Sequence, residues 1–219
     1  VSLEAEPERV YPQSGGGPDT MLAAQLLGFV NRENVGQYGV EQAYQDTLTG
    51  SPRVMVAQRD VNGRAMPETS VVEEPGTIGE DIRLTVDASL QLALEQELLA
   101  AWIADSAKSV SAVVMDPYTG EVYAEGTYPS YDANDYKMVA KETPQRFIDP
   151  VVSSVYEPGS VFKILVAAAG LQERSITPLD RTYCNGEFQL GTATFKDWKE
   201  GGHGTVDLHH AIAQSCNIY

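Results

Sequence analysis

The segment Ser160-Val161-Phe162-Lys163 places a hydroxyl and an amine three residues apart. On a helix this spacing brings both side chains to one face, within reach of each other. A serine hydroxyl is a poor nucleophile and needs a base beside it. A lysine amine can be that base where apolar surroundings or a helix N-terminus favour its neutral form. The spacing therefore predicts Ser160 as a nucleophile and Lys163 as its base.

The Ser-x-x-Lys pattern is weak by itself, because a serine that caps a helix and a lysine that reaches out to water give the same spacing. Two further features favour chemistry. Lys163 is the only charged residue between Glu157 and Glu173. The triplet Ser215-Cys216-Asn217 offers a hydroxyl that can relay a proton and an amide that can bind a substrate carbonyl, although its asparagine could also simply end a helix.

The elements that must position these residues can be outlined from their neighbours. Residues 160–171 follow the break Glu157-Pro158-Gly159 and are apolar on nearly all sides, which predicts a helix buried inside a domain. Residues 181–204 are rich in glycine and loop-like, and Thr205 is expected to cap a short helix that ends near Ser215.

Upstream of this region the sequence alternates between helical and extended patterns. Residues 87–101 predict an amphipathic helix with Leu90, Leu94 and Leu98 on one face and Asp87 as its cap. Residues 82–86 alternate like a strand. Two more strands, at 111–115 and 121–125, are predicted to pair through the turn at 116–120.

The first part of the chain reads as a folded support, because it carries no cluster of catalytic residue types. A helix that ends near Gly28 is predicted in residues 21–30, and a second helix at 39–50. A strand is predicted at 54–57 and a tight turn at 61–64. The segment Glu73-Glu74-Pro75-Gly76 is the best candidate for a domain boundary.

The chain of 219 residues has 15 Lys and Arg against 31 Asp and Glu, a net charge of −16, and 42% hydrophobic residues. This composition is globular, and so acidic a surface disfavours nucleic-acid binding and offers no polybasic patch for anionic lipid. The best apolar run, 164–171, is too short to cross a membrane, and no signal peptide opens the chain. Because the first residue is Val1 rather than a start methionine, we expect any anchor to lie outside this sequence.

Several stretches together resemble the class B penicillin-binding proteins. The segment from Tyr156 to Lys163 looks like their first catalytic motif, and Ser215-Cys216-Asn217 looks like their second. Further similarities follow the family's order: Gly39-Val40-Glu41 through Tyr44, Leu48 and Gly50 in the non-catalytic pedestal, Leu84-Thr85-Val86-Asp87 through Leu90-Gln91, Asp116-Pro117-Tyr118-Thr119-Gly120-Glu121-Val122, and Tyr128-Pro129-Ser130-Tyr131-Asp132-Ala133-Asn134.

The resemblance implies an α+β fold in two parts. Residues 1–78 would form a small α+β pedestal of the dimerisation type. Residues 79–219 would begin a penicillin-binding/β-lactamase-like transpeptidase domain, an antiparallel sheet flanked by helices with a buried helix that bears Ser160.

The resemblance also implies an activity, that of a D,D-transpeptidase that cross-links peptidoglycan. Ser160 would attack a D-Ala-D-Ala stem peptide and form an acyl-enzyme, which an amine of a neighbouring stem then resolves. β-Lactams would acylate the same serine. Lys163 would be its base, Ser215 would relay the proton toward the leaving group, and Asn217 would orient the substrate amide.

Two departures from the family pattern are visible. Cys216 stands in the middle of the second motif, where a serine is common. The third motif, Lys-Thr-Gly or a variant that grips the substrate carboxylate, has no counterpart, since Lys196-Asp197-Trp198 and Lys199-Glu200-Gly201 do not qualify. The sequence is therefore expected to stop before the second half of the catalytic domain and not to be a competent enzyme alone.

The cysteines and histidines give no metal signature. Cys184 and Cys216 are too few for a disulfide framework and are not spaced for zinc, and whether they pair stays open. His203, His209 and His210 read as surface or supporting histidines, because adjacent helix positions do not share a face and no carboxylate or cysteine completes a ligand set. We expect no metal and no cofactor.

Other functions remain open beside the transpeptidase. A D,D-carboxypeptidase or a class D-like β-lactamase would pass the acyl group to water, and a catalytically silent scaffold would only bind β-lactams or partners. The pedestal argues against the first two. The expected partners are peptidoglycan stem peptides, β-lactam antibiotics and membrane proteins of cell division or elongation. The expected location is the bacterial cell membrane, with the catalytic part on the extracytoplasmic side.

Overall fold

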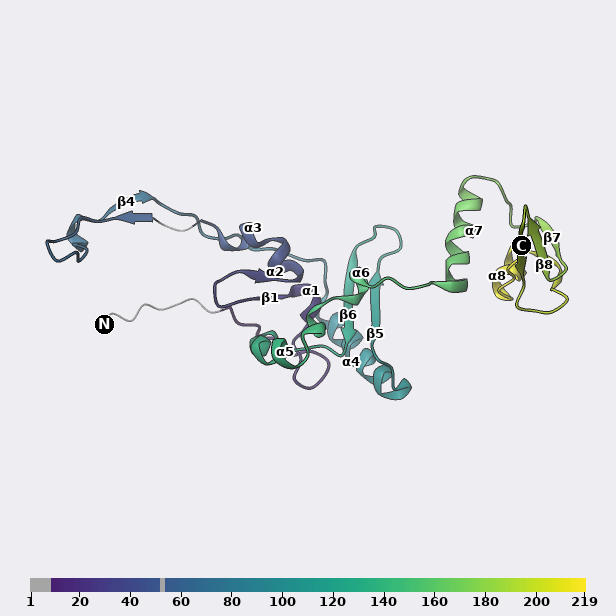
Figure 1. Ribbon diagram of the computed structural model, residues 1–219, viewed down its shortest axis with the longest axis horizontal. Helices are drawn as coiled ribbons and strands as arrows, with labels where there is room; N and C mark the ends of the chain where they lie inside the picture. The colour runs from purple at the N-terminus through teal and green to yellow at the C-terminus, as the bar shows by residue number, and fades with distance from the viewer. Residues whose placement is uncertain (1–8, 52–53) are drawn as a thin grey trace. The chain divides into compact units, whose positions relative to one another are not determined.

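The computed structural model describes residues 9–51 and 54–219, and the chain divides into two units, Val1–Ser154 and Val155–Tyr219. Helices and antiparallel strand pairs occur in both, so the predicted α+β class is confirmed (Figure 1). All strands of the described residues pair in two-stranded ribbons. None of the described helices is long and apolar enough to cross a membrane.

The first unit begins with short elements: α1 (Ala24–Leu27), β1 (Phe29–Val30), β2 (Gly36–Gln37), α2 (Gly39–Ala43) and α3 (Gln45–Thr49). The helix predicted in residues 21–30 is therefore shorter than expected, but it ends at Gly28 as predicted. Gly28 ends it with a φ of 75°, and a side chain there would collide with the carbonyl of Tyr38. The helix predicted at 39–50 is present but interrupted at Tyr44.

An exposed ribbon follows, in which β3 (Val54–Val56) pairs antiparallel with β4 (Val71–Glu74). The 3-10 turn η1 (Pro67–Thr69) precedes β4. The strand predicted at 54–57 is confirmed. The turn predicted at 61–64 is closed by an antiparallel bridge between Arg59 and Ala65.

The long helix α4 (Ala88–Asp105) packs on the antiparallel pair β5 (Val110–Met115) and β6 (Val122–Tyr128) (Figure 1). Asp87 caps the helix as predicted, because its carboxylate accepts from the backbone N–H of Ser89 and of Leu90, both at 2.9 Å. The predicted strand pair is also confirmed. The strand predicted at 82–86 is absent, and that segment runs irregularly.

The buried face of α4 is not the leucine face that the sequence suggested. Leu90 is exposed, whereas Gln91, Glu95 and Leu98 are buried. The Gln91 amide donates to the backbone carbonyl of Glu125 at 2.7 Å, and the Glu125 N–H donates back to the Gln91 side chain at 2.9 Å. Polar side chains are tolerated on this face because each has hydrogen-bond partners.

The core of the first unit joins segments that are far apart in the sequence. Met21, Ala24 and Phe29 pack against Tyr131, Ala133 and Phe147. The later segment is folded into η2 (Ala133–Asp135), α5 (Tyr136–Glu142), η3 (Pro144–Phe147) and α6 (Pro150–Ser153). The Phe147 ring meets the Tyr131 ring edge-on, with centroids 5.0 Å apart.

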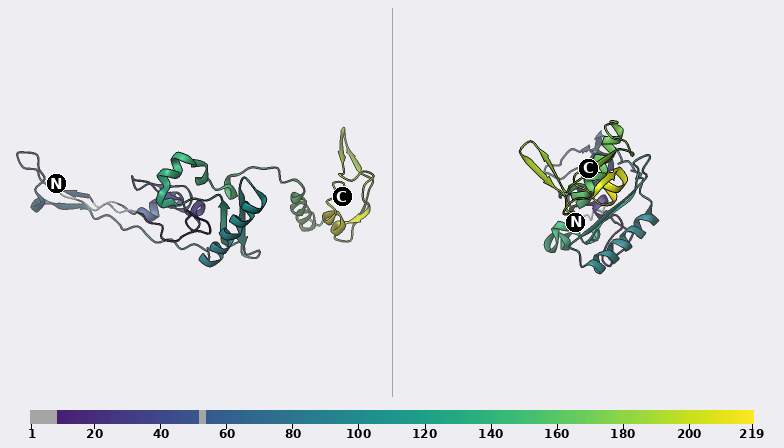
Figure 2. Two further views of the ribbon diagram at one scale, coloured as in Figure 1. Left: turned by 90° about the horizontal axis from the view of Figure 1, so that it is seen from below. Right: turned by 90° about the vertical axis from the view of Figure 1, so that its right-hand side faces the viewer.

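The second unit contains η4 (Gly159–Val161), α7 (Phe162–Gln172), β7 (Arg181–Cys184), β8 (Glu187–Leu190), β9 (Ala193–Lys196), β10 (Gly204–Asp207) and α8 (Leu208–Ala213). β10 pairs antiparallel with β7. β8 pairs with β9 in a ribbon that projects from the unit (Figure 2). The loop predicted at 181–204 is thus wrong, since three strands and part of a fourth lie in this stretch, and Gly191 lies in the turn that joins β8 to β9. Thr205 lies in β10, and Asp207 caps α8 by accepting from the His210 N–H at 2.9 Å.

The expectation that the Ser160 helix is buried is wrong for the described residues. Val161, Ile164, Leu165 and Val166 are each about 60% exposed, and α7 has no buried residue. The physical reason is that α7 packs mainly against η4 and α8 within its unit, which leaves most of its circumference in solvent.

The Glu95 carboxylate ties the N-terminal segment to α4 and gives a stability prediction. It accepts from the backbone N–H of Gly16 at 2.8 Å and of Ala23 at 2.7 Å, and from the Gln91 amide at 2.8 Å. In Glu95→Ala these donors lose the carboxylate as a partner, so we expect the free energy of unfolding to fall by about 3 kcal/mol. The change in the free energy of unfolding is measured by denaturant unfolding, followed by the fluorescence of Trp102. Trp198→Phe is made in both proteins so that Trp102 is the only tryptophan of this sequence.

The matched control is Glu97→Ala, which removes an exposed carboxylate from the same helix and should change the free energy of unfolding by less than about 0.5 kcal/mol. Equal losses in both variants would contradict the assigned role of Glu95.

Candidate active site

Ser160 and Lys163 lie at the start of the helix that the sequence predicted. Gly159 takes a φ of 58°, a conformation that favours glycine, and turns the chain into η4. Ser160 follows in this 3-10 turn, and Lys163 comes in the first turn of α7. The Ser160 side chain is exposed and that of Lys163 is half-buried.

Ser215 is held by the way α8 ends. The Cys216 N–H donates to the Ala211 carbonyl at 2.9 Å, and the Ser215 N–H donates to the Ile212 carbonyl at 3.1 Å. These two bonds form a Schellman motif, which requires a left-handed residue after the helix. Ser215 fills that position with a φ of 53°, although glycine is preferred there.

The three side chains form a continuous hydrogen-bonded chain. Ser215 Oγ donates to Ser160 Oγ at 2.8 Å, and Lys163 Nζ donates to Ser215 Oγ at 3.1 Å and to the Ser215 carbonyl at 2.7 Å. Hydroxyl protons can rotate, so the same contacts allow a proton to travel from Ser160 through Ser215 to Lys163. Lys163 therefore reaches the predicted nucleophile through Ser215.

Asn217 is held by hydrogen bonds of its side chain and its backbone, one of them from Lys163. Its Oδ1 accepts from Lys163 Nζ at 2.6 Å, and its Nδ2 donates to the Lys196 carbonyl at 3.2 Å. Its backbone N–H donates to the Asp197 carboxylate at 3.1 Å. The structure thus brings all four residues that the sequence singled out to one place.

A hollow of about 340 Å³ lies next to these residues, between α7 and α8. Lys163 and Asn217 contribute its polar wall, and Val166, Leu208 and Ile212 are among its apolar lining. The arrangement offers a hydroxyl nucleophile, a relay and an amine beside a mostly apolar surface.

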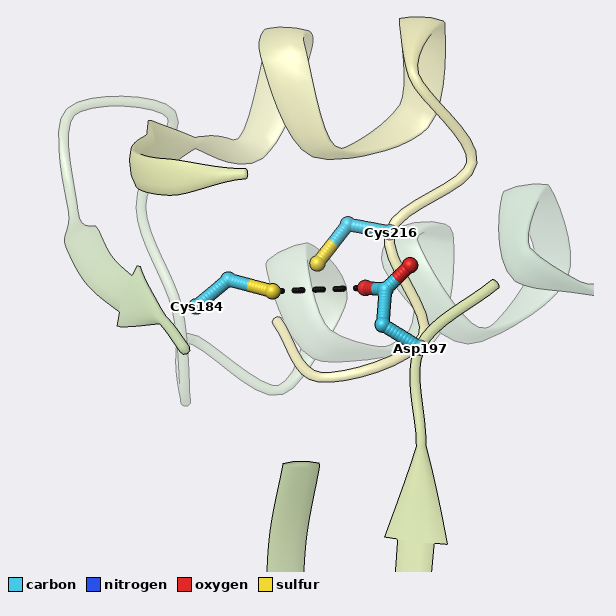
Figure 3. A group of neighbouring side chains, drawn as sticks. All are labelled: Cys184, Asp197 and Cys216. Carbon is cyan, nitrogen blue, oxygen red and sulfur yellow. Dashed lines mark hydrogen bonds between the residues drawn. The ribbon is translucent and has the colours of Figure 1, made fainter. Parts of the chain in front are cut away.

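Behind the second motif lies a buried cluster that the sequence reasoning missed: Cys184, Asp197 and Cys216 (Figure 3). Their ligand atoms lie within 4.8 Å of one another. The Asp197 carboxylate accepts from Cys184 Sγ at 3.3 Å, and its other oxygen lies 3.2 Å from His203 Nε2. The reading of His203 as a histidine without a cysteine or carboxylate partner is therefore wrong.

The sequence does not reveal this cluster because long-range packing assembles it. Cys184 ends β7, Asp197 follows β9 and Cys216 follows α8, so no short spacing joins them. The one signal in the sequence is the presence of cysteine and aspartate, residue types that can bind one another or a ligand. Both cysteines are free, and neither is exposed.

The pKa values of the carboxyl and of one thiol in this cluster shift in opposite directions. Burial raises the pKa of the Asp197 carboxyl, but hydrogen bonds from the Lys199 backbone N–H and from both thiols outweigh it, so its pKa lies well below the usual value. Burial and the nearby Cys184 and Asp197 groups raise the pKa of the Cys216 thiol. The cluster therefore holds a buried negative charge.

The protein has an α+β fold that carries a serine–lysine site. The site consists of the hydrogen-bonded side chains of Ser160, Ser215 and Lys163. A family model of the penicillin-binding protein transpeptidase domain matches residues 110–219, and a model of the penicillin-binding protein dimerisation domain matches residues 1–84. The chain belongs to the penicillin-binding protein transpeptidase family, in the class B arrangement of a dimerisation domain followed by part of a transpeptidase domain.

Individual relatives agree with the family match. The chain is 34% identical over 201 residues to stage V sporulation protein D of Bacillus subtilis, which covers 91% of this chain and 31% of that protein. It is 32% identical over 172 residues to the peptidoglycan D,D-transpeptidase FtsI of Escherichia coli K12, with 78% and 27% covered. The chain spans about a third of the length of these curated relatives.

Among solved structures, the chain is similar to penicillin-binding protein 3 from Mycobacterium tuberculosis complexed with aztreonam. The TM-score is 0.71 at 27% identity, and the match covers 92% of this chain and 41% of that one. A peptidoglycan synthetase from Bifidobacterium adolescentis gives a TM-score of 0.72 at 26% identity, covering 90% and 35%.

The left-handed conformation of Ser215 gives a prediction that separates its backbone from its hydroxyl. A non-glycine residue in this conformation costs about 1–2 kcal/mol. Ser215→Gly and Ser215→Ala both remove the hydroxyl, but only the glycine relieves the backbone. We expect Ser215→Gly to be more stable than Ser215→Ala by about 1 kcal/mol in thermal or denaturant unfolding. Equal stabilities would contradict the strained conformation.

Proposed function

We propose that the protein of which this chain is part is a serine acyl-transferase that cross-links peptidoglycan stem peptides by D-Ala-D-Ala transpeptidation. The observation that carries the proposal is the unbroken hydrogen-bonded path from Ser160 Oγ through Ser215 Oγ to Lys163 Nζ. Such a path supplies a nucleophile with a route for its proton, which acyl transfer from a serine requires.

In the acylation step, Ser160 Oγ attacks the carbonyl carbon of the penultimate D-Ala. Its proton passes to Ser215, whose own proton passes to the Lys163 amine. The peptide C–N bond then breaks, and the terminal D-Ala leaves with a proton returned along the same relay. The products are an ester on Ser160 and free D-alanine, so atoms and charge balance.

In the second step, an amine of a neighbouring stem attacks the ester and restores Ser160. Asn217 supports both steps in this proposal: its side chain anchors the lysine and lies where a substrate amide can reach it. A β-lactam would open on Ser160 in the same way as the peptide, and its ester would persist.

The relatives support this chemistry. The Escherichia coli relative is named a peptidoglycan D,D-transpeptidase, and the Mycobacterium tuberculosis structure holds aztreonam. In the same proposal, residues 1–78 are the pedestal and 79–219 the transpeptidase part. The exposed apolar sides of α7 would be covered by further elements of that domain, which would also supply the group for the substrate carboxylate.

The proposed setting follows from the substrate. Peptidoglycan stem peptides lie outside the cytoplasm, so the catalytic part would face the extracytoplasmic side of the bacterial membrane. Membrane proteins of cell division or elongation are the proposed protein partners.

The proposal is tested by exposing the full-length protein to penicillin and following its intact mass. We expect one adduct, which peptide mapping places on Ser160. Ser160→Ala should take no adduct, and Lys163→Ala should be acylated about 10²–10⁴-fold more slowly, the usual effect of losing a general base. An adduct on another residue would overturn the assignment.

Matched controls are Ser154→Ala and Lys141→Ala, which remove the same exposed groups away from the site and should be labelled at the normal rate. The lifetime of the adduct separates the alternatives. Fast loss to hydrolysed penicillin would favour a β-lactamase, and release of free D-alanine without cross-linked product would favour a carboxypeptidase.

A further inference from the structure

We propose that Trp198 is a positioning residue for the second motif, because its indole N–H fixes the backbone that presents the Ser215 hydroxyl. Trp198 Nε1 donates to the carbonyl of Gln214, the residue directly before Ser215, at 3.0 Å. The role rests on the proposed function, in which Ser215 relays the proton of Ser160. Trp198 acts in it through the backbone and does not touch the reacting atoms.

The Gln214 carbonyl belongs to the peptide plane that leads into Ser215. A peptide unit is planar, so its carbonyl oxygen and the N–H of the next residue turn together. The Ser215 N–H at one edge of this plane donates to the Ile212 carbonyl at 3.1 Å. The Gln214 carbonyl at the other edge accepts from Trp198. The plane before Ser215 is therefore held at both edges.

The peptide plane after Ser215 is held in the same way. The Ser215 carbonyl accepts from Lys163 Nζ at 2.7 Å. The N–H of Cys216, at the other edge of this plane, donates to the Ala211 carbonyl at 2.9 Å. Because both planes are fixed, so are the two backbone angles of Ser215 between them. Of these four hydrogen bonds, only that of Trp198 comes from outside α7 and the end of α8.

The conformation of Ser215 explains why such a restraint matters. Its φ of 53° lies in the left-handed region, which is unfavourable for a residue with a side chain. If the backbone relaxed from this conformation, the hydroxyl would swing away from Ser160 Oγ, which now lies 2.8 Å from it. A displacement of a reacting group by about 1 Å can slow a reaction about 10²-fold. The Trp198 hydrogen bond opposes this relaxation.

Core packing does not account for the place of Trp198, because the residue is 67% exposed. The loop that carries it is closed by its own hydrogen bonds. The Lys199 N–H donates to the Asp197 carboxylate at 3.1 Å, and the Gly202 N–H donates to the Lys199 carbonyl at 3.0 Å. The indole ring also meets the His203 ring edge-on, with centroids 5.5 Å apart. The loop thus directs the indole N–H at one carbonyl.

The two residues before Trp198 contact the other end of the motif. The Lys196 carbonyl accepts from Asn217 Nδ2 at 3.2 Å, and the Asp197 carboxylate accepts from the Asn217 N–H at 3.1 Å. Three consecutive residues after and at the end of β9 therefore bind the backbone or side chains on both sides of Ser215. Trp198 supplies the contact on the side of α8.

The test uses the full-length protein and Trp198→Phe, which keeps an aromatic ring and removes the N–H. Acylation rates over a range of penicillin concentrations separate the affinity of the initial complex from the rate constant of the acylation step. We expect this rate constant to fall about 2–10-fold, the effect of one neutral hydrogen bond, at unchanged affinity. The labelled fraction should still reach that of the wild type, whereas a merely structural defect would lower the labelled fraction.

Trp102→Phe is the matched control. It removes an indole N–H that has no hydrogen-bond partner among the described residues, and it lies in the first unit, so the acylation rate constant should not change. Trp198→Ala removes the ring together with the N–H and should be slowed as much as Trp198→Phe. A normal rate in Trp198→Phe beside a slow rate in Trp198→Ala would assign the effect to the ring and overturn the proposal.

Amide hydrogen exchange gives a second readout that needs no acylation. In Trp198→Phe the backbone N–H groups of Ser215 and Cys216 should exchange faster than in the wild type, because the turn opens more often. If either the acylation rate constant or this exchange matches the wild type, the positioning role is wrong. A wild-type protein that takes no adduct would sink the transpeptidase alone, since the exchange would still decide whether Trp198 holds the turn.

Discussion

The site depends on one backbone turn, the left-handed residue that ends α8. Without it the chain would continue as helix, and the hydroxyl of Ser215 would not reach between Ser160 and Lys163. The two Schellman hydrogen bonds hold this turn. Lys163 adds to it by donating both to the backbone carbonyl and to the hydroxyl of Ser215. The conformation of one residue thus orients nucleophile, relay and amine together.

The second unit shows why such a turn needs support. Its buried apolar cluster consists of Cys184, Val206, Ala211 and Cys216, with Ile218 and Tyr219 packed against it. Within the described residues, the apolar contacts that hold the end of α8 are therefore few. Cys184 and Cys216 belong both to this apolar cluster and to the cluster with Asp197, so the hydrogen bonds of Asp197 add to the apolar contacts at the same place.

Local signals predicted the fold in part. The cap at Asp87, the β5–β6 pair and the helix after Gly159 were all predictable, because each follows from adjacent residues. The buried face of α4 was not, since Gln91 and Glu95 are buried only because partners from distant segments satisfy them. The four site residues could be singled out from motif types, whereas the Cys184 cluster is assembled by strand pairing that no short spacing encodes.

The core of the first unit has a consequence for how the protein is made. Met21, Ala24 and Phe29 have Tyr11 and Leu27 as nearby apolar partners, but Tyr131 and Phe147, which complete their burial, follow more than a hundred residues later. At ribosomal speeds of about 5–20 residues per second, that interval lasts on the order of ten seconds. During synthesis the early segment is exposed for all of this time, and its folding must wait for the arrival of Phe147.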